Sequence, residues 1–238
     1  NATPLADGAM SKEDKSKLDG LPSASTYVHP LKNKKWAACG DSITEHNYRS
    51  LKNYDQYIAE ETGVTVVNMG DSGSGYKQEE ATGTAFYQRI FNVPSDADIV
   101  TILGSFNDIS YPLGTATDTG TATIGGCVNT TIDNLYSLYP TIKLGIISPT
   151  PWKASVLSDE NNAYTKYARL LEEICKNRGI PFLDMYFSSA LRPWDFEYCK
   201  LMYSKDSNDG GVTYNGIHPD ENGHKLFYKK ILKFLESL

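Results

Sequence analysis

The chain has 238 residues, a formal net charge of −6 and 40% hydrophobic residues, which suits a globular protein with one sizeable core. No apolar run approaches the ~20 residues of a membrane-spanning helix, and no basic stretch leading into an apolar one marks a signal peptide. Acidic and basic residues are interspersed, so neither a membrane nor a nucleic acid is expected as a partner.

The first part of the chain, residues 1–29, differs from the rest. Ser11 precedes a short charged segment and Asp14 follows three residues later, a pattern that predicts a helix with Ser11 as its N-cap. This part has too few apolar residues for a core of its own. We therefore expect an N-terminal extension or linker over residues 1–29 and one folded domain over residues 30–238.

From residue 34 onward, short apolar runs alternate with helical patterns. The runs are β-branched or continuously apolar, as in strands that are buried on both faces of a parallel sheet. The predicted strands are Trp36–Cys39, Val64–Met69, Ile99–Leu103, Leu144–Ser148 and Pro181–Met185. The predicted helices are Asp55–Glu61, Ala85–Phe91, Ile124–Leu138, Asn161–Arg178 and Asn222–Leu235. This alternation predicts an α/β fold, a three-layer α/β/α sandwich around a five-stranded parallel sheet.

The four cysteines are widely scattered and form no close-spaced pair of the kind that binds zinc or an iron–sulfur cluster. Cys39 lies in a predicted buried strand and Cys175 in a predicted helix, so buried free thiols are expected, although an even number also permits disulfides. We expect neither a metal site nor a cofactor.

Polar, glycine-rich segments follow three predicted strands, at Gly40–Glu45, Asn68–Gly75 and Gly104–Asp108, and a fourth, Asn215–His224, precedes the last helix. In such folds, sites form at the carboxyl ends of the strands. A strand-to-helix turn can expose a serine hydroxyl and point backbone N–H groups outward, and an asparagine amide can add a donor to an oxyanion. A histidine ahead of the last helix can reach the same sheet edge and accept the serine proton.

These four segments resemble, in order and spacing, the conserved blocks of the SGNH (GDSL-type) hydrolase family. The resemblance covers roughly residues 34–235 and implies the flavodoxin-like fold of that family and a serine esterase activity. It implies that Ser42 is the nucleophile and His218 its base. It also implies an oxyanion hole made by the backbone N–H groups of Ser42 and Gly73 and the side-chain amide of Asn107.

Two residues depart from the family pattern. Ser105 stands where the third block usually has glycine, a mild change that keeps the asparagine amide. Asn215 stands three residues before His218, where the family has an aspartate that orients the histidine. An amide oxygen can hold the ring but cannot stabilise the imidazolium as a carboxylate does, and its NH₂ end can select the wrong tautomer. Three interpretations stay open: a working Ser–His–Asn arrangement, a Ser–His dyad assisted by Asp220 or Asp209, or a degenerate site.

Other residues compete for a role in the site. A second Gly-Asp-Ser ends at Ser72, but the order of the segments favours Ser42 and assigns Ser72 to a turn. His224 is expected to be structural and His46 to be an exposed loop residue. Several of the 16 tyrosines fall in predicted loops, where their rings can stack on sugars, although partial burial of amphipathic rings explains them as well.

We therefore expect a hydrolase that cleaves an oxygen ester through an acyl-enzyme, with a small ester or an O-acetylated or otherwise short-acylated polysaccharide as its substrate. The alternative is a catalytically degenerate carbohydrate-binding module, with Asn215 as the mark of lost catalysis. Residues 6–21 resemble a segment of bacteriophage tail and baseplate proteins. That resemblance implies an extracellular or virion-associated location and a homo-oligomer formed through the N-terminal segment, and a purely structural virion component is a third interpretation.

Overall fold

The computed structural model describes residues 11–20, 28–78, 84–205 and 213–238. The chain divides into two units, Asn1–Pro30 and Leu31–Leu238. The first contains helix α1 (Lys12–Asp19), which begins after Ser11, and the Ser11 hydroxyl accepts a hydrogen bond from the N–H of Asp14 at 3.1 Å. The predicted N-cap is thus confirmed. Of the segment that resembles phage tail proteins, residues 6–10 and 21 lie outside the described residues, and the resemblance stays a prediction.

The second unit is built on five parallel strands in the order β2-β1-β3-β4-β5, the arrangement of flavodoxin-like folds. The strands are β1 (Lys35–Gly40), β2 (Thr65–Gly70), β3 (Ile99–Leu103), β4 (Lys143–Ile147) and β5 (Phe182–Leu183). The predicted five-stranded parallel sheet is confirmed. Only β5 is much shorter than expected, because the Ser148 hydroxyl accepts the N–H groups of Met185 and Tyr186 at 2.8 Å each and the chain leaves the sheet there.

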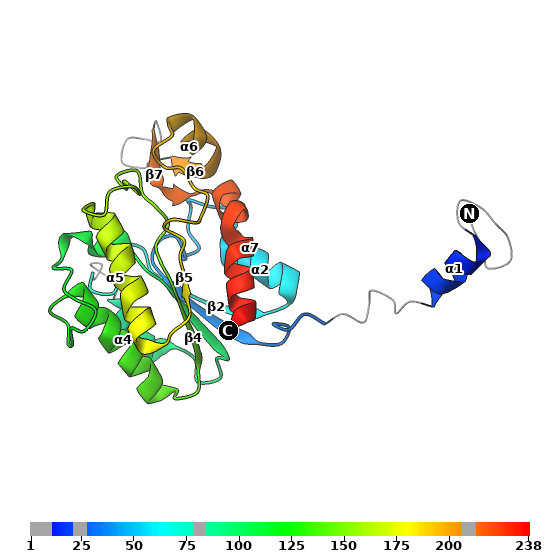
Figure 1. The fold of residues 1–238 in the computed structure, drawn as a ribbon, viewed down its shortest axis with the longest axis horizontal. Coiled ribbons are helices and arrows are strands. Elements are labelled where there is room, and N and C mark those ends of the chain that lie inside the picture. Colours follow the sequence, from blue (N-terminus) through cyan, green and yellow to red (C-terminus); the bar gives the residue numbers. More distant parts are fainter. Residues whose placement is uncertain (1–10, 21–27, 79–83, 206–212) are drawn as a thin grey trace. The chain divides into compact units, whose positions relative to one another are not determined.

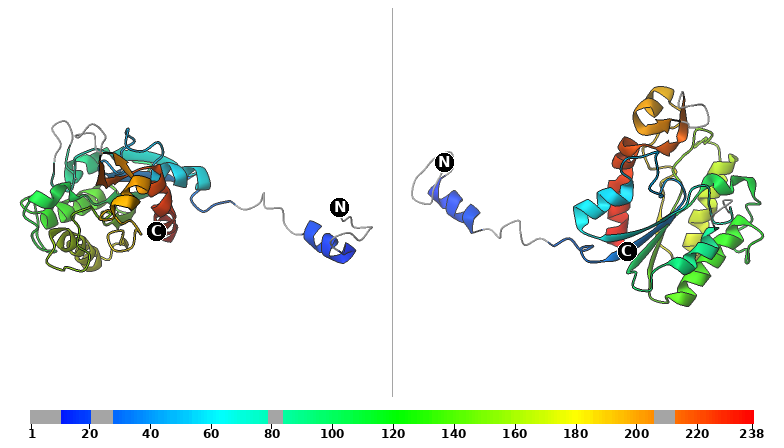
Figure 2. Two further views of the ribbon diagram at one scale, coloured as in Figure 1. Left: turned by 90° about the horizontal axis from the view of Figure 1, so that it is seen from above. Right: turned by 180° about the vertical axis from the view of Figure 1, so that it is seen from behind.

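Helices cover both faces of this sheet (Figures 1 and 2). One face carries α2 (Tyr54–Thr62) and α7 (Glu221–Ser237), and the other carries α4 (Ile124–Leu138) and α5 (Ala163–Arg178). Alternate residues of β1 point to the two cores, so that Trp36 packs on the α2 and α7 side and Ala37 on the α4 and α5 side. The three-layer sandwich is therefore confirmed. None of the helices in the described part of the chain is long and apolar enough to cross a membrane.

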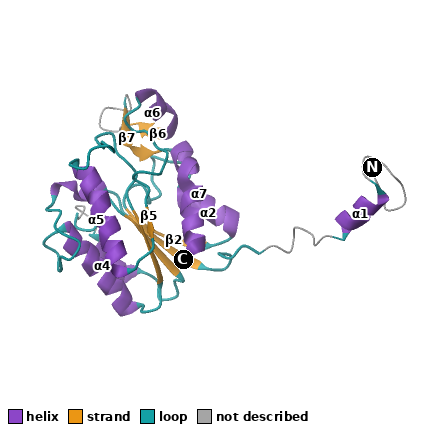
Figure 3. Ribbon diagram, in the orientation of Figure 1, coloured by secondary structure: helices purple, strands orange, loops and turns teal. Residues whose placement is uncertain are grey.

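Several elements differ from the prediction. The helix expected over Ala85–Phe91 is a short α3 (Phe86–Arg89) that continues as a 3₁₀ helix, η2 (Ile90–Asn92). Four elements were not predicted, namely η3 (Phe106–Ser110), α6 (Phe196–Met202), β6 (Tyr203–Lys205) and β7 (Tyr214–Pro219). Strands β6 and β7 pair antiparallel in a sheet of their own beside α6, apart from the main sheet (Figure 3). Because β6 has three residues and the six residues of β7 mix polar and apolar types without alternation, neither strand has a clear periodicity in the sequence.

The cysteines behave as buried thiols. All four lie within the described residues, and each is buried and free. Burial raises the pKa of Cys39 in β1 and of Cys175 in α5 to about 12. At neutral pH these groups are protonated and unreactive, so they serve as small apolar residues of the core, as the sequence predicted.

Candidate active site

Ser42 lies in the turn that follows β1, and hydrogen bonds hold this turn on both sides of the residue. The carbonyl of Asp41 accepts the N–H groups of Thr44 and Glu45 at 3.0 and 2.9 Å. The side-chain amide of Asn47 donates to the carbonyl of Ser42 at 3.0 Å. The backbone of Ser42 is thereby fixed, and its hydroxyl is left to face the neighbouring loops.

The carboxyl of Asp41, next to Ser42, is buried and joins β1 to β3. It accepts the backbone N–H of Ile43 at 2.9 Å and the hydroxyl of Ser105 at 2.5 Å. Burial raises the pKa of Asp41 to about 6, while the hydrogen bonds from Ser105 and Ile43 act in the opposite direction. The Ser105 hydroxyl also accepts the N–H of Asn107 at 3.2 Å. The serine that replaces the usual glycine therefore links the nucleophile turn to the start of η3.

His218 reaches the nucleophile turn from β7. Its Nε2 lies 2.8 Å from the Oγ of Ser42, although the two residues are 176 positions apart in the sequence. Burial lowers the pKa of His218 to about 3, and the nearby positive charge of Arg49 acts in the same direction. The ring is therefore neutral at neutral pH. The structure brings the predicted nucleophile and base within hydrogen-bonding distance.

Asn215 binds His218 with its amide nitrogen. Its Oδ1 accepts the backbone N–H groups of Ile217 at 2.8 Å and of His218 at 3.1 Å, and its Nδ2 lies 3.1 Å from the ring Nδ1 of His218. Only the oxygen of an amide can accept, so the two backbone donors assign the orientation of the side chain. The NH₂ group then donates to Nδ1, which places the ring proton on Nε2.

This tautomer has a direct chemical consequence. With its proton on Nε2, His218 donates to the Oγ of Ser42, whereas a general base needs a free lone pair at that nitrogen. To present that lone pair, the ring must carry its proton on Nδ1, directly opposite the NH₂ group of Asn215. Turning the amide over would bring its oxygen to the ring but would face its NH₂ with two backbone N–H donors. Asn215 thus holds the histidine in the form that cannot accept the serine proton.

Asp220, one of the two carboxylates predicted as possible substitutes for Asn215, binds the start of α7. Asp220 is the N-cap of α7, and its Oδ1 accepts the N–H groups of Asn222 and Gly223 at 2.9 and 3.0 Å. These bonds direct its carboxylate to the start of the helix. Asp209 lies outside the described residues.

The oxyanion candidates meet at the ends of β2 and β3. Gly73 has a φ of 80°, a left-handed conformation that favours glycine, in the loop after β2. The side-chain amide of Asn107 donates to the carbonyl of Ser74 at 3.0 Å, which places it beside that loop. An amide nitrogen carries two hydrogens, so one N–H of Asn107 remains for a substrate oxygen.

Two buried charged side chains, whose roles the sequence did not reveal, hold these loops together. The carboxylate of Asp108 accepts the N–H groups of three successive residues after β2, at 2.7 to 2.9 Å; they are Tyr76, Lys77 and Gln78. The guanidinium of Arg89 donates to the carbonyl of Gly40 at 2.7 Å and to the carboxylate of Asp71 at 2.8 Å. An arginine on a helix of four residues carries no signal that could have predicted this role.

The competing residues have other partners. The hydroxyl of Ser72 donates to the carboxylate of Glu45, in keeping with a turn residue. His224 is buried in the core, where its Nδ1 accepts the N–H of Tyr54 at 3.3 Å, as expected of a structural histidine. His46 is half exposed, but its Nε2 lies 2.8 Å from the buried carboxylate of Asp55. It therefore anchors its loop to α2, which the expectation of an exposed loop residue did not include.

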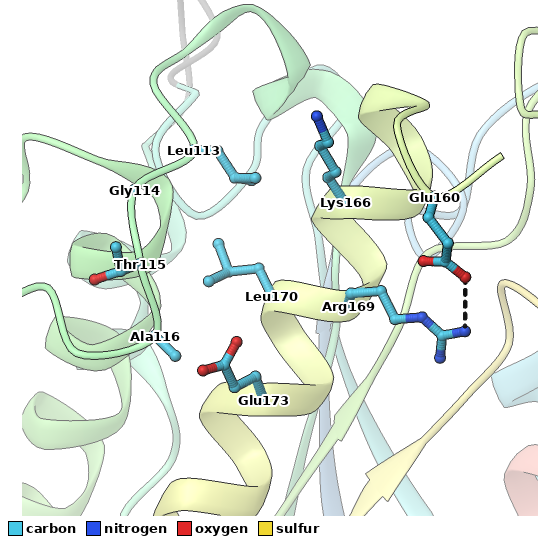
Figure 4. A pocket seen from close by; sticks show the side chains of 9 residues that line it. All are labelled: Leu113, Gly114, Thr115, Ala116, Glu160, Lys166, Arg169, Leu170 and Glu173. Atoms are coloured by element: carbon cyan, nitrogen blue, oxygen red, sulfur yellow. Dashed lines mark hydrogen bonds and ion pairs between the residues drawn. The ribbon is translucent and has the colours of Figure 1, made fainter.

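A pocket in the described part of the chain is lined by none of the candidate site residues. It has a volume of about 390 Å³ and lies between residues 113–116 and helix α5 (Figure 4). There Arg169 points to Glu160, at 3.4 Å, while Leu170 and Glu173 point toward the loop. A second pocket of about 330 Å³ is lined by residues 155–158 and Trp194. It adjoins the segment of Lys153, whose N–H donates to the carbonyl of Gly216 at 3.0 Å.

Solved structures share this fold at low sequence identity. A protein from Lactobacillus plantarum is 23% identical, with a TM-score of 0.72, and the match covers 87% of this chain and 98% of that one. Two variants of a Geobacillus stearothermophilus enzyme also match over 86% of this chain and 94% of theirs. One is described as an acetyl-xylooligosaccharide esterase, with 20% identity and a TM-score of 0.53. The other is described as an acetylxylan esterase, with 18% identity and a TM-score of 0.54.

At the level of sequence, no curated protein matches this chain. The model of the GDSL-like lipase/acylhydrolase family, however, matches residues 38–226, which include both Ser42 and His218. That span covers most of the chain and all five strands of the main sheet except the first residues of β1. The chain therefore belongs to the GDSL-like lipase/acylhydrolase family.

Proposed function

We propose that this protein is a serine esterase that removes acetyl or other short acyl groups from a carbohydrate. The observation that carries the proposal is the 2.8 Å contact between the Oγ of Ser42 and the Nε2 of His218 at the carboxyl end of β1. In the reactive tautomer, His218 accepts the proton of Ser42 as the hydroxyl attacks the ester carbonyl. The backbone N–H groups of Ser42 and Gly73 and the amide of Asn107 stabilise the oxyanion.

The second half of the reaction uses the same groups. His218 passes its proton to the departing alcohol, water attacks the acyl-enzyme, and the acid is released. Ser42 and His218 regain their starting protonation at the end of the cycle, so no cofactor is needed. Because Asn215 favours the opposite tautomer of His218, we expect this chemistry to be slow in the protein with asparagine at that position.

Exposed aromatic rings near the site support a carbohydrate substrate. Tyr48, six residues after Ser42 in the sequence, is 71% exposed, and Trp194, which lines the second pocket, is 48% exposed. Trp194 follows Pro193, whose carbonyl packs against Gly216, two residues before His218. Rings of this kind stack on the apolar faces of sugars. The esterases from Geobacillus stearothermophilus share only the fold, but their acetylated xylan substrates are of the same class.

Hydrolysis assays on the wild type and Ser42→Ala test the proposal. We expect the wild type to release p-nitrophenol from p-nitrophenyl acetate and acetate from O-acetylated xylan, and Ser42→Ala to reduce both rates to the background. Ser72→Ala is the matched control, because it removes the other Gly-Asp-Ser hydroxyl and should leave the rates unchanged. Equal rates in wild type and Ser42→Ala would refute the esterase. Cleavage of long-chain lipids without release of acetate from glycans would refute the carbohydrate substrate.

The orientation of Asn215 favours a second candidate, a carbohydrate-binding module that has lost catalysis. In this case the protein binds an acylated glycan without cleaving it, and Ser42→Ala binds as tightly as the wild type. Calorimetric titration with O-acetylated xylan fragments distinguishes the two candidates. Binding without turnover, in the wild type and in Asn215→Asp, would favour the module.

A further inference from the structure

The Nδ2 of Asn215, which favours the unreactive tautomer of His218, belongs to an Asn-Gly dipeptide. Asn-Gly is the sequence in which asparagine most readily loses its amide. We propose that Asn215 is a modification site, which deamidates spontaneously to aspartate and thereby converts a weak Ser–His–Asn arrangement into a Ser42–His218–Asp triad. The inference rests on the proposed esterase function for its consequence, but the modification itself rests on the local geometry.

Glycine is required next to Asn215 by the fold. Gly216 has a φ of 62°, and a Cβ at this position would lie 2.8 Å from the carbonyl oxygen of Pro193 and 3.1 Å from the Cβ of Lys153. Without a side chain, the Gly216 nitrogen is the least hindered nucleophile that can follow an asparagine. The packing of the histidine segment therefore retains the dipeptide that favours deamidation.

The surroundings of the amide also favour the reaction. Both donors to Oδ1, the N–H groups of Ile217 and His218, lie beyond Gly216 in the chain, so the Asn215 side chain folds back along the Gly216 peptide. The same two donors polarise the Cγ carbonyl and would stabilise the oxyanion that forms when a nucleophile attacks it. The departing Nδ2 lies 3.1 Å from the Nδ1 of His218, which accepts one of its hydrogens, so the proton that releases ammonia is supplied by water.

The reaction needs only water as a co-reactant. The backbone nitrogen of Gly216 forms a bond to the Cγ of Asn215 and gives up its proton, and Nδ2 gains a proton and leaves as ammonia, which closes a five-membered imide. Water then adds to Cγ and breaks its bond to the Gly216 nitrogen, which takes back a proton. The original peptide is restored, and residue 215 carries a carboxylate. Attack of water at the main-chain carbonyl instead would give isoaspartate.

The product reverses the tautomer of His218. One carboxylate oxygen keeps the two backbone donors that now bind Oδ1, and the other takes the place of Nδ2 beside the ring. An oxygen there accepts a hydrogen bond from Nδ1–H, so the ring proton moves to Nδ1 and the lone pair of Nε2 faces Ser42. The negative charge also stabilises the imidazolium that forms during catalysis.

The chain contains a matched internal control in a second Asn-Gly, at Asn222 and Gly223 in the first turn of α7. The N–H of Gly223 donates to the N-cap carboxylate of Asp220 at 3.0 Å, and the Nδ2 of Asn222 donates to the carbonyl of Leu201 at 3.3 Å. The helix holds this nucleophile away from the side chain that precedes it. We expect residue 222 to keep its amide while residue 215 loses it.

The experiment follows mass and activity in one sample. Freshly purified wild type is incubated at mildly alkaline pH, peptides that contain residues 215 and 222 are mapped by mass spectrometry, and p-nitrophenyl acetate hydrolysis is measured at each time. We expect conversion to aspartate at residue 215 ahead of residue 222, and activity that rises in proportion, about 10²–10⁴-fold, toward that of Asn215→Asp. Asn215→Gln, which would have to form a six-membered imide, should gain neither mass nor activity.

The outcomes separate this inference from the proposed function. Conversion at residue 215 no faster than at residue 222, or conversion mainly to isoaspartate, would overturn the proposed deamidation to aspartate. An active Asn215→Asp would in that case still support the proposed esterase. If residue 215 converts but neither the aged protein nor Asn215→Asp hydrolyses any ester, the esterase fails while the modification stands.

Discussion

The two halves of the candidate site are built in different ways. The turn that carries Ser42 is held by two tertiary contacts, in which Ser105 of the β3 end binds Asp41 and Arg89 binds the carbonyl of Gly40. A local contact from Asn47 to the carbonyl of Ser42 adds to them. The histidine is oriented by a local contact, since Asn215 reaches only the next three residues. A single substitution at residue 215 can therefore change the chemistry of His218 without disturbing the serine.

This difference bears on the proposed function, in which the fold of the site is complete and the reaction is slow. The buried network around Asp41 preserves the geometry of the turn, so the contact between Ser42 and His218 stays at 2.8 Å. Asn215 places an NH₂ group beside the Nδ1 of His218, where a carboxylate oxygen would accept a hydrogen bond from Nδ1–H. The positions of the side chains and the tautomer of His218 are thus separate requirements for catalysis. Each of the following experiments changes one or the other.

The largest effect on turnover is expected for Asn215→Asp, which changes only the contact between residue 215 and His218. Turnover of p-nitrophenyl acetate should rise about 10²–10⁴-fold over freshly prepared wild type, because the carboxylate selects the productive tautomer and stabilises the imidazolium. Asn222→Asp, the same chemical change in the first turn of α7, is the control and should leave turnover unchanged. A gain of less than about tenfold would show that Asn215 does not limit the reaction.

Asn107→Ala tests whether the side-chain amide of Asn107 donates to the oxyanion. In the Asn215→Asp background, kcat should fall about 10²–10³-fold with little change in KM, because a donor to the transition state is removed. Thermal unfolding of the same protein monitors the lost bond to the carbonyl of Ser74. If stability drops and kcat does not, Asn107 only supports the loop.

Ser105→Ala removes the link between the β3 end and the nucleophile turn. It leaves a buried oxygen of Asp41 without its 2.5 Å donor, at a cost of about 1–3 kcal/mol in the free energy of unfolding. Urea denaturation measures this value. Ser105→Thr, which retains the hydroxyl, should recover most of the loss. An unchanged stability in Ser105→Ala would mean that the buried carboxyl is satisfied in another way.

The smallest expected effect is on the pH profile. A general base is active when unprotonated, so the rate falls as the pH drops through its pKa. The pKa of His218 is lowered to about 3, so in fresh wild type this group should cause no loss between pH 8 and pH 5. In Asn215→Asp the carboxylate raises this pKa, and kcat/KM should fall about tenfold per pH unit below it. Since Asp41, with its pKa of about 6, is common to both proteins, the difference between the profiles reports on His218.

Much of the fold could be predicted from the sequence because its signals are local. Continuous apolar runs mark β1, β3 and β4 as strands buried on both faces, and the helical periodicity of α4 and α5 is long enough to be unambiguous. In the β6–β7 pair, β6 has only three residues and β7 lacks an apolar alternation, so neither was predicted. The length of β5 was overestimated because a side chain, Ser148, ends its pairing.

The candidate residues could also be selected from the sequence, since glycine-rich turns and their order along the chain are visible in it. The sequence by itself determined that Ser42, Gly73, Asn107 and His218 follow strands of one sheet or precede its last helix, and that residue 215 is an amide. Only the tertiary structure decided which way that amide faces. The choice depends on two backbone N–H groups that can bind the oxygen alone, and their position exists only once β7 has formed. The same holds for Ser105 and Arg89, whose partners come from other strands and are brought within reach by the packing of the sheet.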